Sequence, residues 1–373
     1  MSVENNTDLW MQRALELAAQ GQGSVEPNPM VGAVLVQGTE IVGEGYHQKF
    51  GGPHAEIHAI SQAGEKARGA TLFVTLEPCC HQGKTPPCTE AIIQAGIKQV
   101  VAAGPDPNPI VAGKGFDILR QAGIEVTTGF YRERAEALNA PYFKYIIEKV
   151  PYFIAKWAMT IDGKIASASG DSKWISNKTS RSCVHHLRGR VDAVVVGINT
   201  VLKDDPLLTA RPPGARKACR LVFDRQLQLP LNSKLVSTAQ EFPVLVVHAS
   251  QDVQKIKQLE QAGCECWEVQ SADRIEQVQL LSHELYRRKC TNVLIEGGAT
   301  LLGSFFDQKL VDEVWAFIAP KWLGSNLALG PVSGTGYELV SQAGRLRDVK
   351  VEILDQDVLI RGRCEYSPKS GTQ

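Results

Sequence analysis

The chain has 373 residues, 43% hydrophobic and 21% charged, which is typical of a soluble globular protein with room for two domains. Its 40 Lys and Arg residues balance 40 Asp and Glu residues, and this formal charge of zero argues against nucleic acid as the main partner. The N-terminal residues do not resemble a secretory signal, no apolar run approaches the roughly 20 residues of a membrane span, and nine irregularly spaced cysteines suit a reducing cytoplasm better than a disulfide framework.

The first half of the chain alternates helical and strand patterns. Asp8 is placed to cap an N-terminal helix whose apolar face carries Trp10, Ala14, Leu17 and Ala18. The patterns predict strands over 31–36, 41–46, 72–76, 100–103 and 124–128, and helices over 55–67, 89–95, 116–122 and 132–148. This order predicts a layered α/β domain whose strand-to-helix junctions lie at one edge of a sheet.

Two of these junctions carry residues that suit a catalytic zinc. His54, Cys79 and Cys88 offer one imidazole and two thiolates, three ligands that leave the fourth tetrahedral position open. Glu56 is two residues from the histidine and free for proton transfer. The order His-x-Glu, Pro-Cys, Cys is that of zinc-dependent deaminases, in which an activated water attacks the amine-bearing carbon of a ring.

Other ligand choices compete with this one. His58 lies four residues after His54, as in a metalloprotease helix, but that motif has Glu directly after the first histidine and here Ala55 stands there. Cys80 and His81 adjoin Cys79, which we prefer because the preceding proline fixes the turn out of the strand. Ordinary buried cysteines are the remaining alternative, although three of the nine lie within ten residues beside a Gly/Pro-rich loop.

Pro151 marks the expected boundary between a domain of residues 1–150 and one of residues 151–373. After it the pattern predicts a helix over 177–190, a helical stretch at 303–308, and strands over 152–159, 193–197, 221–223, 243–247, 292–295, 314–318 and 351–354. A GxGxxG fingerprint is absent from the sequence. The second domain is therefore also α/β, without the usual dinucleotide motif.

Phosphate-binding features do appear in this second half. The Gly297-Gly298 turn leads from a strand into a helix and exposes backbone N–H groups that could bind a phosphate. In many proteins, however, glycines at such a turn serve only its backbone conformation. A second segment leaves its strand through Gly197 and is flanked by Arg188, Arg211 and Arg216, each of which is either a phosphate partner or a surface charge. These residues predict a phosphate-rich ligand but no particular reaction.

Taken together, the motifs resemble a known family. The segments in order are PNPMVGAVLV (27–36), GGPHAEIHA (51–59), TLEPCCHQGKTPPC (75–88), WAMTIDGKIA (157–166), VVVGINTVLKDDPLLTAR (194–211) and IEGGATLLGSF (295–305). They are similar to the bifunctional deaminase–reductases of riboflavin biosynthesis. The resemblance implies an N-terminal cytidine-deaminase-like three-layer domain and a C-terminal dihydrofolate-reductase-like α/β domain.

The resemblance also implies substrates and partners. The first reaction would deaminate 2,5-diamino-6-ribosylamino-4(3H)-pyrimidinone 5′-phosphate to the corresponding uracil, and the second would reduce its ribosyl group to ribityl with NADPH. We expect one zinc ion per chain, small phosphorylated pyrimidines as ligands, no nucleic-acid or membrane partner, and a homo-oligomer in the cytoplasm. The alternatives are a nucleic-acid base deaminase, which the balanced charge disfavours, a binding protein with a structural zinc, and a chain in which only the deaminase half is active.

The resemblance assigns residues as well. Zinc falls on His54, Cys79 and Cys88, with Glu56 as the proton shuttle. NADP falls on Ala158, Trp174, Thr200, Asp204, Gly298, Ala299, Thr300, Leu301, Leu302, Gly303 and Ser304. Substrate falls on Ser172, Arg188, Leu208, Arg211 and Glu296. Lys156 and Glu296 are candidates for handling the ribose as it opens, and Arg225 for the 2′-phosphate of NADPH, whereas Cys80 and Cys183 receive no role.

Overall fold

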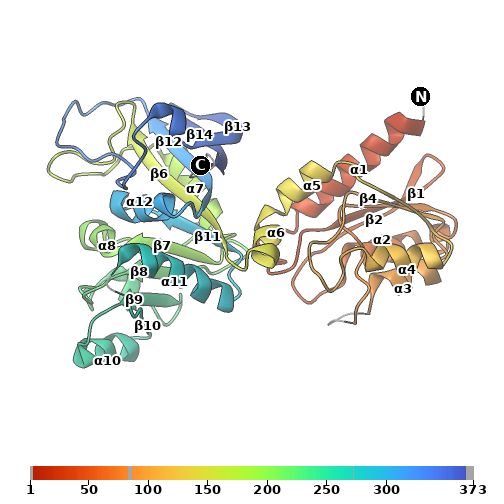
Figure 1. Cartoon of the computed structure of the whole chain (residues 1–373), viewed down its shortest axis with the longest axis horizontal. Helices are drawn as coiled ribbons and strands as arrows, with labels where there is room; N and C mark the ends of the chain where they lie inside the picture. The colour runs from red at the N-terminus through yellow and green to blue at the C-terminus, as the bar shows by residue number, and fades with distance from the viewer. Residues whose placement is uncertain (1–2, 83–85, 272, 367–373) are drawn as a thin grey trace, which may run out of the picture. The chain divides into compact units, whose positions relative to one another are not determined.

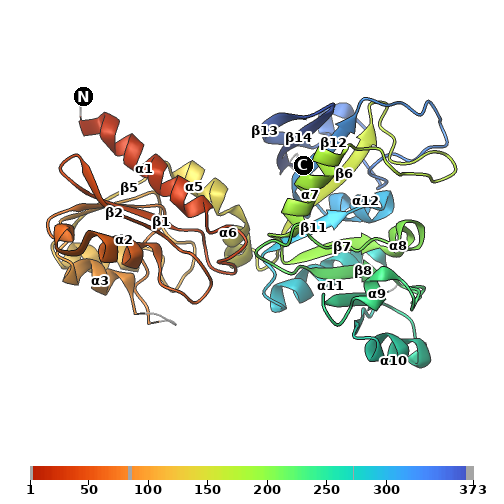
Figure 2. The same ribbon diagram turned by 180° about the vertical axis from the view of Figure 1, so that it is seen from behind.

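The computed structural model describes residues 3–82, 86–271 and 273–366. The chain forms two compact units, Met1–Lys149 and Val150–Gln373, which divide one residue before the boundary expected at Pro151 (Figures 1 and 2). Each unit has its own sheet and its own buried core. Among the described residues, no helix combines the length and apolarity needed to cross a membrane.

The first unit is built on a five-stranded sheet in the order β2-β1-β3-β4-β5. The strands are β1 (Gly32–Gln37), β2 (Glu40–Tyr46), β3 (Thr71–Val74), β4 (Gln99–Ala102) and β5 (Glu125–Thr128). Strand β1 is antiparallel to both β2 and β3, while β3, β4 and β5 are parallel. The parallel strands therefore end at the same edge, where the loops after them can meet.

Helices cover both faces of this sheet, which gives three layers (Figure 1). Because side chains alternate along a strand, Ala33 and Leu35 of β1 face one core and Val34 and Val36 face the other. The first core includes helices α2 (Ala55–Ala63), α3 (Cys88–Gln94) and α4 (Lys114–Gln121). The second includes α1 (Val3–Ala19) and α5 (Arg132–Leu138), after which come α6 (Ala140–Ile147) and, between α2 and β3, the short η1 (Gly64–Ala67).

Helix α2 lies unusually close to strand β2, and glycine makes this possible. A Cβ added at Gly45 would lie 2.4 Å from the carbonyl oxygen of Ala55, and one at Gly43 would lie 2.2 Å from that of Ala59. Any larger residue would push the helix away from the strand. The two glycines thus fix the start of α2, which carries His54 and Glu56.

Two expectations for the first unit were wrong. Asp8 does not cap the first helix, because α1 already begins at Val3. The helix predicted over 132–148 is broken at Asn139 into α5 and α6. The side chain of Asn139 accepts a hydrogen bond from the N–H of Met30 and donates one to its carbonyl, and the proline in the first turn of α6 suits a new helix start.

The second unit contains a nine-stranded sheet in the order β10-β9-β8-β7-β11-β6-β12-β14-β13. The strands are β6 (Tyr152–Thr160), β7 (Ala193–Gly197), β8 (Cys219–Phe223), β9 (Val244–His248), β10 (Glu265–Glu268), β11 (Asn292–Glu296), β12 (Val311–Ala319), β13 (Arg345–Leu354) and β14 (Asp357–Glu365). The first seven in the sheet order are parallel, and the hairpin of β13 and β14 is added antiparallel at one edge.

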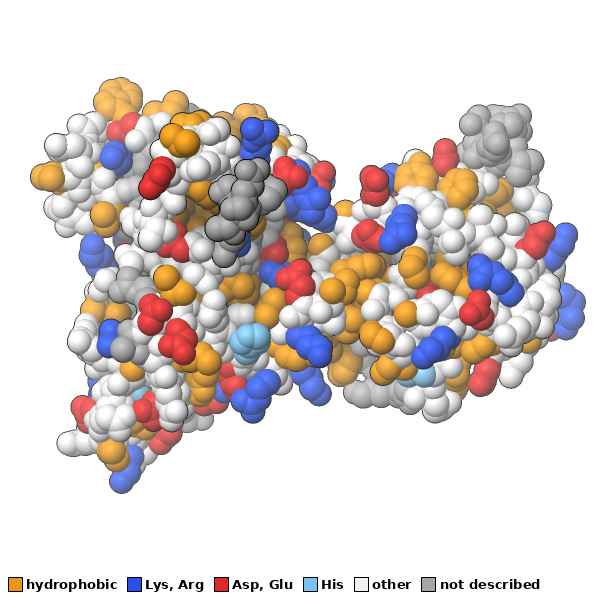
Figure 3. Space-filling model, in the orientation of Figure 1, with side chains coloured by type: hydrophobic (Ala, Val, Ile, Leu, Met, Phe, Trp, Pro, Cys, Tyr) orange, Lys and Arg blue, Asp and Glu red, His pale blue; other side chains and the backbone are white. Residues whose placement is uncertain are grey.

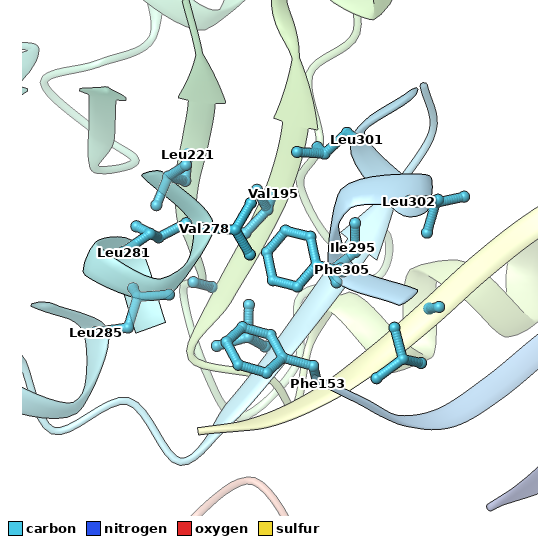
Figure 4. Close-up of a cluster of buried hydrophobic side chains, with 14 of the residues drawn as sticks. Phe153, Val195, Leu221, Val278, Leu281, Leu285, Ile295, Leu301, Leu302 and Phe305 are labelled. Atoms are coloured by element: carbon cyan, nitrogen blue, oxygen red, sulfur yellow. The ribbon is translucent and has the colours of Figure 1, made fainter. Parts of the chain in front are cut away.

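The core of this unit lies between the parallel strands and two helices. The helices of the unit are α7 (Lys178–Arg188), α8 (Ile198–Asp204), α9 (Lys234–Ser237), α10 (Val253–Gln261), α11 (Arg274–Arg287), α12 (Ala299–Asp307) and the short η2 (Val340–Gln342). Helices α11 and α12 supply Leu281 and Phe305 to the core, where the ring of Phe305 lies 5.0 Å from that of Phe153 (Figure 4). The sequences of such buried central strands are nearly continuous runs of apolar residues.

Sequence patterns missed several elements here. Helices α8, α10 and α11 and strands β10 and β14 had not been predicted. Helix α12 begins at Ala299, directly after the Gly-Gly turn, and the predicted strand 351–354 is the end of the longer β13. In β13 the apolar residues Val349, Val351 and Ile353 are exposed, so the strand shows no alternation between a buried and a polar face.

Candidate active sites

Three donor atoms converge in the first unit. His54 is the N-cap of α2, Cys79 follows β3, and Cys88 is the first residue of α3; their donor atoms all lie within 4.8 Å of one another. The Nδ1 atom of His54 is 3.2 Å from the sulfur of Cys88 and 3.4 Å from that of Cys79. Bond lengths of about 2.0 and 2.3 Å in a tetrahedral zinc site place nitrogen and sulfur ligands about 3.5 Å apart. The spacing therefore fits a zinc ion with one open position.

The competing donors lie outside this group. Among the described residues, the cluster contains Cys79 and neither Cys80 nor His81, and it does not include His58. Cys80 is partly buried, and burial together with the charges of Glu77 and Cys79 raises the pKa of its thiol.

The three donor side chains share protons through hydrogen bonds, and a bound cation would replace these protons. The hydrogen bond from the Cys88 thiol, together with one from His54, lowers the pKa of Cys79 to about 4 despite burial. The same hydrogen bond to Cys79, together with burial, raises the pKa of Cys88. The bond to Cys79 also raises the pKa of His54. Two sulfurs and an imidazole that compete for protons at this distance are the environment in which a divalent cation displaces those protons.

Glu56 lies in the first turn of α2 with only 3% of its surface exposed. Among the described residues its Oε2 atom has no hydrogen-bond partner. Burial, with a smaller contribution from the charge of Cys79, raises the pKa of Glu56 to about 7. A buried oxygen without a partner costs about 1–3 kcal/mol. Its place beside three metal donors indicates that a further ligand, such as a water, completes the site.

The sequence assigned no role to Glu77, yet this residue supports the cluster. Its buried carboxylate accepts hydrogen bonds from the backbone N–H groups of Asp106, Gly113, Gly115 and Phe116, at 2.9–3.3 Å. These bonds hold the loop after β4 and the start of α4 against the segment that carries Cys79. Its position directly before Pro-Cys was the only signal in the sequence.

In the second unit, two adjacent strands bring a buried cation and carboxylate together. Lys156 of β6 pairs in register with Glu296 of β11, and its Nζ lies 3.9 Å from the Glu296 Oε2. Arg188, at the end of α7, donates from Nε to Oε1 of Glu296 at 2.5 Å and from Nη2 to Oε2 at 2.8 Å. Arg188 and Glu296, 108 residues apart in the chain, thus form a two-pronged ion pair.

The ion pair determines the protonation of this cluster. Burial alone would raise the pKa of Glu296, but the charge and hydrogen bonds of Arg188 lower it below its ordinary value, helped by Lys156. Burial lowers the pKa of Lys156, Arg188 lowers it further, and Glu296 opposes both. Glu296 is therefore held ionised, while the ammonium of Lys156 gives up its proton more readily than an exposed lysine.

The Gly-Gly turn has the backbone that only glycine adopts easily. Gly297 and Gly298 both have φ of 81°, and a Cβ at Gly297 would lie 3.3 Å from the Oγ1 of Thr200. The first turn of α12 follows, and its N–H groups have no intrahelical acceptors. The turn, Thr200 and the start of α12 therefore form a surface that a phosphate could approach closely.

The later residues of the predicted cofactor segment, 301–304, lie within helix α12. Leu301 and Leu302 pack in the hydrophobic core, as Figure 4 shows. A Cβ at Gly303 would lie 2.1 Å from the carbonyl oxygen of Ser333, and the hydroxyl of Ser304 donates to the carbonyl of Thr300. The side chains of Leu301, Leu302 and Ser304 therefore contribute to packing within the unit, and a role of residues 301–304 in cofactor binding stays a prediction.

The remaining predicted residues lie at several places in the second unit. Ser172 donates to Asp204 at 3.3 Å, Trp174 is 63% exposed with Arg181 stacked on it at 4.5 Å, and Leu208 is buried with φ of 56°. Ala158 pairs with Phe317 in β12, and Arg225 is exposed after β8. Arg211 is exposed, whereas Arg216 forms an ion pair with Asp192 at 3.0 Å.

These features define a protein with a zinc-deaminase-type α/β unit followed by a reductase-type α/β unit. Comparison with known proteins agrees with both halves. Residues 4–104 match the cytidine and deoxycytidylate deaminase zinc-binding region, and residues 151–360 match the RibD C-terminal domain. The first unit is thus cytidine-deaminase-like and the second dihydrofolate-reductase-like, which confirms the fold class predicted from the sequence.

Full-length relatives identify the family. The chain is 43% identical over 360 residues to riboflavin biosynthesis protein RibD of Actinobacillus pleuropneumoniae, covering 96% of each chain. The structure of RibD from Acinetobacter baumannii is similar with a TM-score of 0.85 and 39% identity, covering 97% of this chain and 99% of that one. A deaminase/reductase structure from Thermotoga maritima gives the same TM-score, identity and coverage. The chain belongs to the RibD family of riboflavin-biosynthesis enzymes, as its motifs had indicated, and carries a deaminase and a reductase domain.

Breaking the ion pair between Arg188 and Glu296 should destabilise the second unit. Arg188→Met leaves a buried carboxylate with only Lys156 nearby, so we expect its free energy of unfolding in urea to fall by about 3–5 kcal/mol. Because the pKa of Glu296 is lowered on folding, the pair's contribution is present above the unfolded-state pKa and declines as the pH falls toward the folded-state value. The double variant Arg188→Met/Glu296→Gln should recover most of the loss, and a single-variant loss below about 1 kcal/mol would contradict the role of the pair.

Proposed function

We propose that the chain catalyses two successive steps of riboflavin biosynthesis. The first unit would deaminate 2,5-diamino-6-ribosylamino-4(3H)-pyrimidinone 5′-phosphate, and the second would reduce the ribosyl group of the product to ribityl with NADPH. The observation that carries this proposal is the His54, Cys79 and Cys88 cluster beside Glu56, whose Oε2 atom has no hydrogen-bond partner in the described part of the chain. The relative from Thermotoga maritima is described as a diaminohydroxyphosphoribosylaminopyrimidine deaminase/5-amino-6-(5-phosphoribosylamino)uracil reductase, which names the same two substrates.

In the deaminase site, Glu56 is the group that moves protons. Zinc held by His54, Cys79 and Cys88 would supply Lewis-acid activation of a water at neutral pH. Glu56 would accept a proton from that water and pass it to a ring nitrogen. It would then take the second proton from the hydroxyl of the adduct and give it to the amine, which leaves as ammonia. Water replaces the amine, so the carbon gains an oxygen and loses nitrogen without any redox change. A buried carboxylate with a pKa of about 7 can accept and donate a proton within one turnover.

In the reductase site, Lys156 and Glu296 would divide the work at the sugar. Glu296 is held ionised by Arg188 and would bind a ribose hydroxyl. Lys156 would donate a proton to the ring oxygen as the C1–O bond breaks, which leaves a protonated imine at C1. Hydride from NADPH would then add at C1 to give the ribitylamine, and solvent would return a proton to Lys156.

Phosphate recognition would separate into substrate and cofactor parts. Arg188 is committed to Glu296, so we assign the substrate 5′-phosphate to Arg211 and keep Ser172 and Leu208 as further substrate residues. The stretch from Gly298 to Thr300 would meet NADPH together with Ala158, Trp174, Thr200 and Asp204, and Arg225 would meet the 2′-phosphate. Basic and acidic side chains are interspersed on the face shown in Figure 3, which suits a small ligand better than a nucleic acid. A homo-oligomer and a cytoplasmic location stay predictions.

The metal assignment is tested by cysteine substitution. Cys88→Ser should lose zinc because the hydroxyl is a poor ligand and only two donors remain. Cys80→Ser is the matched control and should retain one zinc per chain. Elemental analysis of the purified variants measures this, and zinc retained without Cys88 would remove that residue from the site.

Replacing the proposed proton shuttle tests the two reactions separately. Wild-type protein should release ammonia from the diaminopyrimidine, and only with NADPH should product mass increase by two further hydrogens. Glu56→Gln keeps the shape of the side chain but not its titration, so zinc should stay bound while deamination falls by at least about 10²-fold.

The same variant should still reduce supplied 5-amino-6-ribosylaminouracil 5′-phosphate, because the Lys156 and Glu296 cluster lies in the other unit. Mass spectrometry of the products measures both steps. Near-normal ammonia release would exclude Glu56 from the mechanism, and loss of both activities in a folded, zinc-loaded variant would contradict the division of labour.

Arg211 should act on the phosphorylated substrate and not on NADPH. Arg211→Ala removes a charged hydrogen bond, so substrate KM should rise by about 10- to 150-fold, equivalent to roughly 1.5–3 kcal/mol. The KM for NADPH should be nearly unchanged. Arg287→Ala, at an arginine with a 76% exposed side chain on α11, is the control. Steady-state kinetics with each ligand varied decides the matter, and a loss confined to NADPH would move Arg211 out of the substrate site.

A further inference from the structure

His185, which the sequence did not single out, lies beside the proposed substrate residues. It is on α7, three residues before Arg188, so the two side chains share a face of the helix. Its Nδ1 is 3.0 Å from the carbonyl oxygen of Thr209, and its Nε2 is 3.3 Å from Nη2 of Arg211. Both ring nitrogens are thus used, one on the backbone and one on an arginine.

The two partners determine which nitrogen of His185 carries the proton. A carbonyl oxygen can only accept, so Nδ1 must be the donor to Thr209. A guanidinium can only donate, so Nε2 must be the acceptor from Arg211. These requirements are met together by the neutral ring protonated at Nδ1, and a charged ring would oppose Arg211 with a second N–H group.

The surroundings keep this ring neutral. Burial and the charge of Arg188 lower the pKa of His185, and the charge of Arg211 lowers it further; the hydrogen bond to Thr209 and the charge of Glu296 oppose this but leave the pKa below its ordinary value. Arg188 is on the same helix, Arg211 is on the loop after α8, and Glu296 is at the end of β11. With two cations and one carboxylate nearby, the ring is surrounded by net positive charge.

His185 also holds the backbone that carries Arg211. The carbonyl of Thr209 accepts from His185 and, at 3.4 Å, from Nη1 of Arg188. The end of α7 is therefore tied to the loop two residues before Arg211. The ring of His185 holds the loop before Arg211 through Nδ1 and the guanidinium of Arg211 through Nε2. Both the backbone and the end of the side chain of Arg211 are therefore restrained.

We propose that His185 is a positioning residue of the reductase site, which orients Arg211 toward the phosphate of the substrate by accepting one of its N–H groups. Arg211 has five N–H donors, so one bond to His185 leaves the others for phosphate oxygens. The inference rests on the proposed role of Arg211 in binding that phosphate. His185 itself does not contact the reacting atoms.

Two substitutions separate the functions of the two ring nitrogens. In His185→Asn the short amide can still donate to Thr209 but cannot reach Arg211. In His185→Gln the longer amide places an oxygen near the Nε2 position, where it can accept from Arg211. We expect His185→Asn to raise the KM for 5-amino-6-ribosylaminouracil 5′-phosphate about 3- to 10-fold, the usual worth of one hydrogen bond, with kcat and the KM for NADPH nearly unchanged. His185→Gln should restore the KM, and His186→Asn, at the exposed neighbouring histidine, should leave it unchanged.

A double-mutant cycle with Arg211→Ala gives the decisive measurement. If His185 acts through Arg211, His185→Asn should have no further effect once Arg211 is gone. An equal rise in KM with and without Arg211 would overturn the inference while leaving the role of Arg211 intact. If Arg211→Ala itself leaves the KM unchanged, the proposed phosphate role fails and the inference fails with it, so the two failures are distinguishable.

A measurement on the unmodified ring covers the case in which His185→Asn does not fold. In wild-type protein labelled with 15N at histidine, and assigned by comparison with His185→Gln, Nδ1 of His185 should show the shift of a protonated nitrogen and Nε2 that of an unprotonated one. The opposite tautomer would overturn the proposal, because Nε2 could not then accept from Arg211.

Discussion

Burial of a carboxylate is the constraint on which both sites depend. Glu56 and Glu296 are both buried, and an ionised carboxylate is unfavourable in such surroundings unless a cation or hydrogen bonds stabilise it. One oxygen of Glu56 has no hydrogen-bond partner among the residues that the structure describes, and burial raises its pKa to about 7. Glu296 has the fork of Arg188, and its pKa falls below its ordinary value. A glutamate is therefore suited to exchanging protons in the first unit and to remaining ionised in the second. The difference comes from the hydrogen-bond and charge partners that the surrounding elements provide in each unit.

The fold supplies these partners through the ends of its elements. In the first unit, Gly43 and Gly45 let α2 approach β2, and Glu77 ties the neighbouring loop to the segment of Cys79 through four backbone N–H groups. In the second unit, the register of β6 and β11 sets Lys156 beside Glu296. Rigid elements thus hold the reacting groups, while the loops between them carry residues that meet ligands.

Sequence patterns predicted the features that depend on residues close together in the chain. The His-x-Glu and Pro-Cys spacings found the three donors that the structure brings within 4.8 Å, and alternation found the strands of the first unit. The break at Asn139 was missed because its cause is a bond to Met30, 109 residues earlier. The partner of Arg188 was missed for the same reason, since Glu296 lies 108 residues later. Glu77 stands next to the cysteine motif, and its structural role was not predicted. Its four backbone partners lie in the loop after β4 and at the start of α4, and the periodicity of hydrophobic residues does not show which side chain such a loop contacts.

The balanced composition also concealed a local imbalance of charge. Lys156, Arg188 and Arg211 gather near one carboxylate, Glu296, so three cations less one anion leave an excess of two positive charges. A phosphate monoester carries about −1.5 to −2 at neutral pH, which nearly cancels that excess. His185 has to stay neutral for the cancellation to hold, since a third excess charge would repel Arg211 at the distance where the two now share a hydrogen bond. The zero net charge of the whole chain therefore argues against a polyanion as the main partner and is still compatible with a site built for one small anion.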